Sequence, residues 1–265
     1  MKSLSFHYHL KITMDAPVSR HCFTLRCLPV SDERQKIAEL RYFLSPVAYL
    51  SEDRDQWGNA LLYGRCLGEQ TCFEANVCGL AELGFAQGTA EREIERARVF
   101  AFPTPLTQAD GALRDFAESL PLRSGAPEEA EAVMRAVHDA LSYQPGATTV
   151  QTTAAEAFSM GRGVCQDYAH VMLAVLRLKG VPCRYAAGML LGEGESHAWV
   201  EVLHGGLWTG YDPTNCLTVS DQHIKLSHGR DAGDCALNRG VFRGGARQKT
   251  DISVLVTACE ERTLC

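Results

Sequence analysis

The sequence predicts an α+β protein with an antiparallel β-rich domain over residues 1–104 and a second domain over residues 105–265, in which helices pack on an antiparallel sheet. In the first part, short segments of alternating bulky and polar residues are separated by turn signals at regular intervals. From Gln108 the period changes, because apolar residues recur at helical spacing, and strands return only after Pro182. The proline-containing segment 100–106 is the predicted linker.

The first part is predicted to be a sandwich of short strands. Alternating bulky and polar residues, or turn signals on either side, indicate strands at 6–12, 22–29, 59–63 and 71–80. The segment 41–50 is rich in aromatic and β-branched residues around Pro46, so strand-turn-strand is favoured there over the helix that the composition of 33–44 would also allow. Charged residues 91–98 are expected to form a solvated segment rather than a binding tail.

The second part is predicted to contain four helices. Their expected ranges are 113–120, 127–141, 154–160 and 165–179. Pro121 ends the first helix, and Pro127, followed by acidic residues in the first turn, begins the second. Gly180 and Pro182 end the fourth helix.

Composition and charge exclude several classes of function. The net charge of −6 gives no electrostatic support for a nucleic-acid partner. No apolar stretch is long enough to span a bilayer, so no membrane partner is expected, and the N-terminus lacks the apolar core of a signal peptide, which favours the cytoplasm. Eleven cysteines at irregular spacing, without a Cys-x-x-Cys pair, indicate neither a disulfide framework nor a zinc ribbon. We expect no metal and no cofactor.

Cys165 is the first candidate for chemistry. Gly161 and Gly163 mark a turn directly before it, so Cys165 is expected in the first turn of the fourth helix. Unpaired backbone N–H groups and the helix dipole stabilise a thiolate at such a position, and the same groups can bind an oxyanion during acyl transfer. The common alternative for a cysteine is a small buried core residue.

His197 and Asp212 are expected on one face of a β-hairpin. Strand residues 197–203 are followed by Gly205-Gly206 and a return strand that ends at Asp212. If the loop is 203–206, Asp212 lies opposite His197; if the turn is Gly205-Gly206 alone, Asp212 lies opposite Trp199 and diagonal to His197. Both registers bring the carboxylate within reach of the imidazole, as in a catalytic triad. The alternative is a surface His–Asp pair.

Three blocks carry a resemblance to a known family. They are Gly-Val-Cys165-Gln-Asp-Tyr-Ala-His, His197-Ala-Trp-Val-Glu-Val and Tyr-Asp212-Pro-Thr-Asn. In order and spacing they resemble the core of the bacterial transglutaminase-like superfamily, whose fold is related to papain. The tail block from His223 resembles the family's following segment, except that Cys235-Ala236 replaces a hydrophobic pair, and the N-terminal part is similar, more weakly, to the domain that precedes the core in many members.

The resemblance implies a papain-like or transglutaminase-like core with a Cys–His–Asp thiol mechanism. The expected enzyme is a cysteine protease or amide hydrolase acting on a protein, peptide or carboxamide substrate by acyl transfer. A protein-glutamine transamidase is the alternative within the family. A binding or assembly protein that keeps the fold without catalysis is the alternative outside enzymes, and the three intact residues argue against it.

Residues next to the three candidates have expected roles as well. Gln166 follows the nucleophile and could donate to the oxyanion or face solvent. Trp199 shares the face of His197 and could line the cleft or shield the His–Asp pair. Asp167 is expected to favour the helix dipole, and His170 is turned away from Cys165 by the helical rotation.

Overall fold

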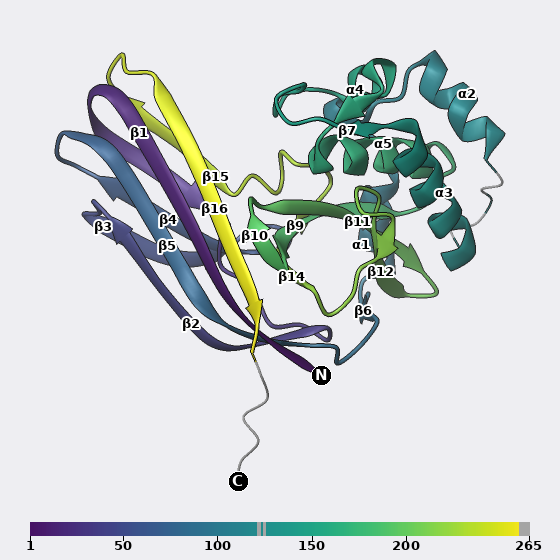
Figure 1. Cartoon of the computed structure of the whole chain (residues 1–265), viewed down its shortest axis with the longest axis horizontal. Coiled ribbons are helices and arrows are strands. Elements are labelled where there is room, and N and C mark those ends of the chain that lie inside the picture. The colour runs from purple at the N-terminus through teal and green to yellow at the C-terminus, as the bar shows by residue number, and fades with distance from the viewer. Residues whose placement is uncertain (121–122, 124–125, 260–265) are drawn as a thin grey trace, which may run out of the picture.

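The computed structural model describes residues 1–120, 123 and 126–259. Long strands form one side of the molecule, and helices with a smaller sheet form the other (Figure 1). The mixed architecture confirms the predicted α+β class. No helix in the described part of the chain is long and apolar enough to cross a membrane.

Strand β1 (Lys2–Leu25) is the centre of the first sheet system. Its first half pairs with β5 (Gln70–Leu83) and β16 (Gln248–Ala258), and its second half pairs with β4 (Ala60–Cys66) and β15 (Asn238–Arg243). The predicted strands 6–12 and 22–29 are therefore parts of one strand. Register shifts between Thr13 and Val18 and between Ser19 and Cys22 allow the strand to pass from one sheet to the other.

The strand-turn-strand prediction around Pro46 is confirmed. Strand β2 (Gln35–Ser45) pairs with β5, and β3 (Tyr49–Arg54) pairs with β4. Alternation along β1 buries Leu4, Phe6, Tyr8, Leu10 and Ile12. The apolar face of this sheet therefore supplies a large part of the hydrophobic core.

The two ends of the chain meet in the first sheet. Strands β15 and β16, from the C-terminal end, both pair with β1. The segment 192–196, predicted as a loop, contains a short strand, β10 (Gly192–Gly194), which pairs with β16. The prediction missed β10 because its partner lies far away in the sequence. A domain boundary at residue 104 stays a prediction.

The segment between the two parts packs against the smaller sheet. Strand β6 (Gly88–Ala90) pairs with β12 and is followed by α1 (Ile94–Ala97). Two 3-10 turns, η1 (Arg98–Ala101) and η2 (Pro105–Thr107), contain most of the predicted linker. Its aromatic side chain at Phe100 is buried edge-on against Trp208.

The four predicted helices are confirmed to within two residues. They are α2 (Gly111–Ser119), α3 (Pro127–Ala140), α4 (Ala154–Met160) and α5 (Cys165–Leu178). Asp110 and Thr153 cap α2 and α4 by accepting backbone N–H groups. Pro121, predicted to end the first helix, lies outside the described residues.

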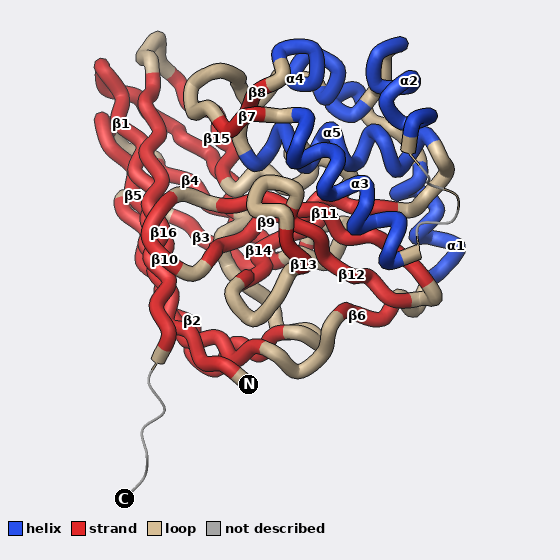
Figure 2. The backbone as a smooth tube through the Cα atoms, turned by 45° about the vertical axis from the view of Figure 1, so that its right-hand side comes forward, coloured by secondary structure: helices blue, strands red, loops and turns tan. Residues whose placement is uncertain are grey.

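The smaller sheet has the order β13-β12-β11-β9-β14. Its strands are β9 (Cys183–Leu190), β11 (His197–His204), β12 (Leu207–Asp212), β13 (Leu217–Thr218) and β14 (His223–Gly229). A further short pair, β7 (Ser142–Tyr143) and β8 (Arg162–Gly163), lies before α5. Figure 2 shows helices α2 to α5 gathered beside these strands.

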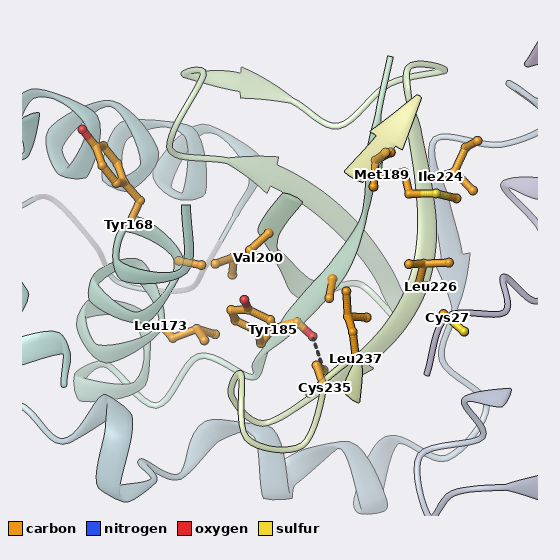
Figure 3. Packing of buried hydrophobic residues seen from close by; sticks show 14 of the residues in the cluster. Cys27, Tyr168, Leu173, Tyr185, Met189, Val200, Ile224, Leu226, Cys235 and Leu237 are labelled. Carbon is orange, nitrogen blue, oxygen red and sulfur yellow. Dashed lines mark hydrogen bonds between the residues drawn. The ribbon is translucent and has the colours of Figure 1, made fainter. Parts of the chain in front are cut away.

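Helix α5 packs on one face of the smaller sheet. In Figure 3, Leu173 of α5 lies near Tyr185 and Val200, which belong to neighbouring strands. The alternate residues of these strands face the other way and are buried as well. Gln35 Nε2 donates to the Lys225 carbonyl and Asn59 Nδ2 to the His228 carbonyl, so side chains of the N-terminal half cover the edge of the sheet at β14. The sheet is thus buried on both faces, which allows polar side chains to be held away from water.

Candidate active site

The N-terminus of α5 is fixed by Asp167. One carboxylate oxygen, Oδ2, accepts the Val164 backbone N–H and the Thr148 hydroxyl, both at 2.7 Å. A side chain at position 163 would bring its Cβ to 2.5 Å from this oxygen, so the turn before the helix requires Gly163. Asp167 therefore does more than favour the helix dipole, because it also shapes the chain before Cys165.

Cys165 is the first residue of α5 and is partly buried. Its thiol lies 4.0 Å from the carbonyl oxygen of Ser196, the residue that precedes β11. The start of α5 and the start of β11 therefore meet at one point.

The β11–β12 hairpin brings His197 and Asp212 together. Its register pairs His204 with Leu207, so the turn is Gly205-Gly206, and both glycines have positive φ. This is the second of the two predicted registers, with Asp212 diagonal to His197. The distance from His197 Nε2 to Asp212 Oδ2 is 2.7 Å.

The environment strongly favours a protonated His197. Burial alone would lower the pKa of His197, but its hydrogen bonds with Asp212 and with the thiol of Cys165 raise it to about 10. Since Nε2 is occupied by Asp212, Nδ1 is the nitrogen left to face the thiol. The imidazole thus links the carboxylate to the sulfur.

Asp212 is held from several directions. Its Oδ1 accepts the backbone N–H groups of Thr214 and Asn215, and its Oδ2 accepts the Asn215 side-chain amide at 2.8 Å. Burial would raise the pKa of the Asp212 carboxyl, but hydrogen bonds with His197 and His223 hold it well below its usual range. The carboxylate is therefore charged, rigid and fully buried.

Two partners of Asp212, Asn215 and His223, were not predicted from the sequence. The Asp-Pro-Thr-Asn sequence is compatible with a side-chain-stabilised turn, which was a signal for Asn215. His223 carried no local signal, because β14 is not adjacent to β12 in the sheet. His138 of α3 also supports the loop, since its Nδ1 contacts the Pro213 carbonyl at 3.1 Å.

Trp199 and Gln166 occupy different surroundings. Trp199 is fully buried over Gly188, where a Cβ would come within 2.5 Å of the indole. This position favours the shielding role over a direct contact with substrate. Gln166 is partly exposed, and its Nε2 donates to the Val150 carbonyl at 3.4 Å. A role for either residue in binding substrate or oxyanion stays a prediction.

His170 is turned away from the site, as predicted. It is fully buried, and its Nε2 accepts the Ala232 backbone N–H at 3.2 Å. Burial lowers its pKa to about 4, so it is a neutral structural residue. Burial also raises the pKa of two core thiols, to about 12 for Cys27 and to about 11 for Cys183, so these thiols stay protonated.

One group of ligand-type atoms raises the question of a metal ion. The donor atoms of His197, Asp212 and His223 all lie within 4.8 Å of one another. Two ligands of a tetrahedral zinc, each about 2.0–2.1 Å from the ion, stand about 3.3 Å apart. The His197–Asp212 distance of 2.7 Å is too short for that geometry and suits a shared proton. These residues therefore do not fit zinc as they are arranged.

Comparison with known proteins bears on the segment that holds the site. Residues 114–213, which contain Cys165, His197 and Asp212, match the transglutaminase-like superfamily. This segment of the chain is therefore similar to the core of that superfamily. The match covers the helices α2 to α5 and the strands as far as β12.

Relatives and a solved structure extend the similarity. An uncharacterised protein of Mycobacterium leprae is 42% identical over 47% of this chain and 47% of its own length, so the match spans about half of each protein. An uncharacterised protein of Mycobacterium tuberculosis is 26% identical over 88% of this chain and 85% of its own. A crystal structure from Cytophaga hutchinsonii, named as a candidate cysteine protease, is 20% identical with a TM-score of 0.82 over 98% of this chain and 91% of that one. This last likeness confirms the fold over nearly the whole chain.

Proposed function

We propose that this transglutaminase-like protein is a thiol-dependent acyl-transfer enzyme acting on peptide or carboxamide bonds, most simply as a cysteine peptidase or amide hydrolase. The observation that carries the proposal is the meeting of the α5 start with the β11 start: the Cys165 thiol lies 4.0 Å from the carbonyl oxygen of Ser196, and the next residue, His197, lies 2.7 Å from the buried carboxylate of Asp212. A nucleophile, a base and an orienting carboxylate in this order form the catalytic unit of thiol acyl transfer.

In the proposed reaction, Cys165 is the nucleophile. His197 holds the thiol proton while the sulfur attacks the carbonyl carbon, and a C–S bond forms. The C–N bond then breaks, and His197 gives the proton to the leaving amine. Water, activated by neutral His197, attacks the thioester, releases the acid and restores the thiol. Asp212 stabilises the imidazolium form throughout and keeps Nδ1 directed at sulfur.

The start of α5 supplies the site for the oxyanion. The first backbone N–H groups of any α-helix lack an intrahelical acceptor, and here they belong to Cys165 and its neighbours. These groups are rigid, because Asp167 fixes the turn before them. They are suited to donate to a carbonyl oxygen as its charge develops during attack.

The substrate is proposed to be a protein, a peptide or another carboxamide. Tyr143 is largely exposed beside the site, and burial together with the charges of Cys165 and Glu195 raises its pKa. An exposed aromatic surface next to the nucleophile is suited to an acyl chain with an apolar side group. No cofactor is required by this chemistry. The cytoplasmic location also belongs to the proposal, and cell fractionation tests it.

Acylation by p-nitrophenyl acetate tests the proposal without knowledge of the natural substrate. The wild-type chain is expected to release p-nitrophenolate in a burst and to gain one acetyl group on Cys165, as seen by intact mass and peptide mapping. Cys165→Ala is expected to lose the burst. Cys78→Ala, which removes an exposed thiol on β5, is the matched control and is expected to keep it. A burst that survives Cys165→Ala would contradict the proposal.

The fate of the acyl group distinguishes a hydrolase from a transamidase. A hydrolase is expected to lose the acetyl group to water at a rate that added glycine ethyl ester does not change. A transamidase is expected to transfer it to the amine and to form the acetylated product. Product analysis by mass spectrometry decides between them.

A further inference from the structure

His223 lies behind the proposed triad. It is the first residue of β14, is 1% exposed, and points to the same face of the sheet as His197 and Asp212. Its Nε2 is 3.4 Å from Asp212 Oδ2. Its ring lies edge-on to the Trp199 indole, with the ring centroids 5.4 Å apart. His223 is thus packed firmly against the carboxylate side of the triad and away from the thiol.

The hydrogen-bond partners of His223 define its tautomer. Its Nδ1 faces the Ser220 backbone N–H at 3.4 Å, and a backbone N–H can only donate. Its Nε2 faces a carboxylate, which accepts. Nδ1 must therefore be unprotonated and Nε2 must carry the hydrogen, so the ring is neutral. Burial also lowers the pKa of His223, with the hydrogen bond to Asp212 acting in the opposite direction.

We propose that His223 is a positioning residue that acts through Asp212 and donates from Nε2 to keep the carboxylate charged and directed at His197. This inference rests on the proposed thiol mechanism. The charged and titratable groups facing His223 are Asp212 of β12, His197 of β11 and, at longer range, Arg34.

The contribution of His223 follows from the change of charge during the reaction. When His197 gives its proton to the leaving amine, the buried carboxylate of Asp212 loses its cationic partner. The neutral His197 still donates from Nε2 to Oδ2, and two further neutral donors, the Asn215 amide and His223, share that oxygen. A neutral donor stabilises the carboxylate without adding a charge that would repel the imidazolium. His223 thereby supports Asp212 in both protonation states of His197.

The tautomer is measured on the wild-type protein by two-bond ¹H–¹⁵N NMR correlation of the histidine rings near neutral pH. The expected result is a neutral ring at position 223 with hydrogen on Nε2. Hydrogen on Nδ1, or on both nitrogens, would overturn the proposal, because Nε2 would then lack the proton or the Ser220 N–H would face a second donor. This measurement needs no activity, so it also decides the proposal if p-nitrophenyl acetate fails to acylate the wild type.

Two substitutions separate hydrogen-bond donation from ring packing. His223→Gln keeps a donor and is expected to acylate within about three-fold of wild type. His223→Phe keeps a ring and is expected to lose about ten-fold in acylation, the weight of one hydrogen bond. His228→Phe makes the same change later on β14 and serves as the control for folding, which circular dichroism checks in all variants. Equal losses in Gln and Phe variants, or full activity in His223→Phe, would overturn the proposal.

A spectroscopic signal reports on Asp212 directly. The proton in the short His197–Asp212 hydrogen bond is expected far downfield in the ¹H spectrum of the wild type and of His223→Gln. In His223→Phe it is expected to broaden or disappear, because the carboxylate is no longer held. An unchanged signal in a folded His223→Phe protein would contradict the positioning role.

Discussion

Two clusters of buried charge lie on the same face of the smaller sheet, with Trp199 between them along β11. One contains His197 and Asp212. The other pairs Glu201 with Arg184 Nε at 2.6 Å and with Lys225 Nζ at 3.2 Å. Both carboxylates are almost completely buried, and burial would raise both pKa values. Partners hold the pKa of each carboxyl well below its usual range instead.

The clusters differ in what their cations do. Arg184 and Lys225 hold Glu201 in ion pairs, and the Arg184 guanidinium stacks 4.2 Å from the Trp208 ring centroid. His197 can gain and lose its proton and also contacts a thiol at a helix start. The comparison shows that buried charge alone does not indicate catalysis. A partner that can transfer its proton to a reacting group is the distinguishing feature.

The sharpest test of this difference is His197→Ala. The variant loses the base and the partner of the thiol, so the acylation rate is expected to fall by at least about 10⁴-fold. The melting temperature is also expected to fall, because the buried carboxylate of Asp212 loses its cationic partner, so acylation is compared per folded molecule. His204→Ala, at the other end of β11, is the matched control and is expected to acylate normally. Acylation in His197→Ala within about ten-fold of wild type would remove His197 from the mechanism.

Glu201→Gln should lower the stability of the protein and leave acylation unchanged. Removing one charge from a buried ion pair leaves Arg184 without its carboxylate and Lys225 with Asp32 alone, so the free energy of unfolding is expected to fall by about 3–5 kcal/mol. Acylation per folded molecule should stay near wild type. Urea unfolding followed by circular dichroism measures the first quantity, and the p-nitrophenyl acetate burst below the transition measures the second. A lost burst in folded protein would mean that the two clusters act together.

Asp212→Ala is expected to have a smaller effect on acylation than His197→Ala. The imidazole keeps its contact with the thiol but loses its orientation, so a loss of about 10²–10³-fold is expected, less than the 10⁴-fold seen for the orienting residue of a serine protease. Asp221→Ala, on the loop before β14, is the control. Undiminished turnover in a folded Asp212→Ala protein would leave a Cys–His pair as the catalytic unit.

The smallest expected effect is on the pH dependence of the free energy of unfolding, to which His197 contributes. The pKa of His197 is raised from its ordinary value of 6.5 to about 10 in the folded protein. Its stabilising contribution is therefore complete below about pH 6.5 and is lost as the pH rises toward about 10. His197→Gln should weaken this decline in the free energy of unfolding, whereas the exposed His204→Gln should not. Identical pH profiles for wild type and His197→Gln would contradict the raised pKa.

Local patterns predicted much of the site. The glycines before Cys165 and the proline after the helix placed the thiol at a helix start, and the two-residue period of strands placed His197 and Asp212 on one face. The register of the hairpin remained open in the sequence, because a Gly-Gly turn fits more than one loop length. In the structure His204 pairs with Leu207, so the turn is Gly205-Gly206, and both glycines adopt the positive φ that such a turn needs.

Long-range pairing limited the rest of the prediction. Strand β1 appeared in the sequence as two strands, since nothing local shows that one strand crosses between two sheets. Strand β10 was missed because β16 pairs with it from about sixty residues away. His223 was missed as a partner of Asp212 for the same reason. Asn215 was missed although the Asp-Pro-Thr-Asn sequence is compatible with a turn in which the two side chains meet.

Cys165 is proposed to be an activated nucleophile, and competitive alkylation tests this role most directly. The wild-type protein is treated with substoichiometric iodoacetamide at about pH 6, where ordinary thiols are protonated, and the modified cysteines are identified by peptide mapping. We predict that Cys165 is modified before every other cysteine, including the exposed Cys78. Preferential modification of Cys78 or any other cysteine, with Cys165 unlabelled, would contradict the account.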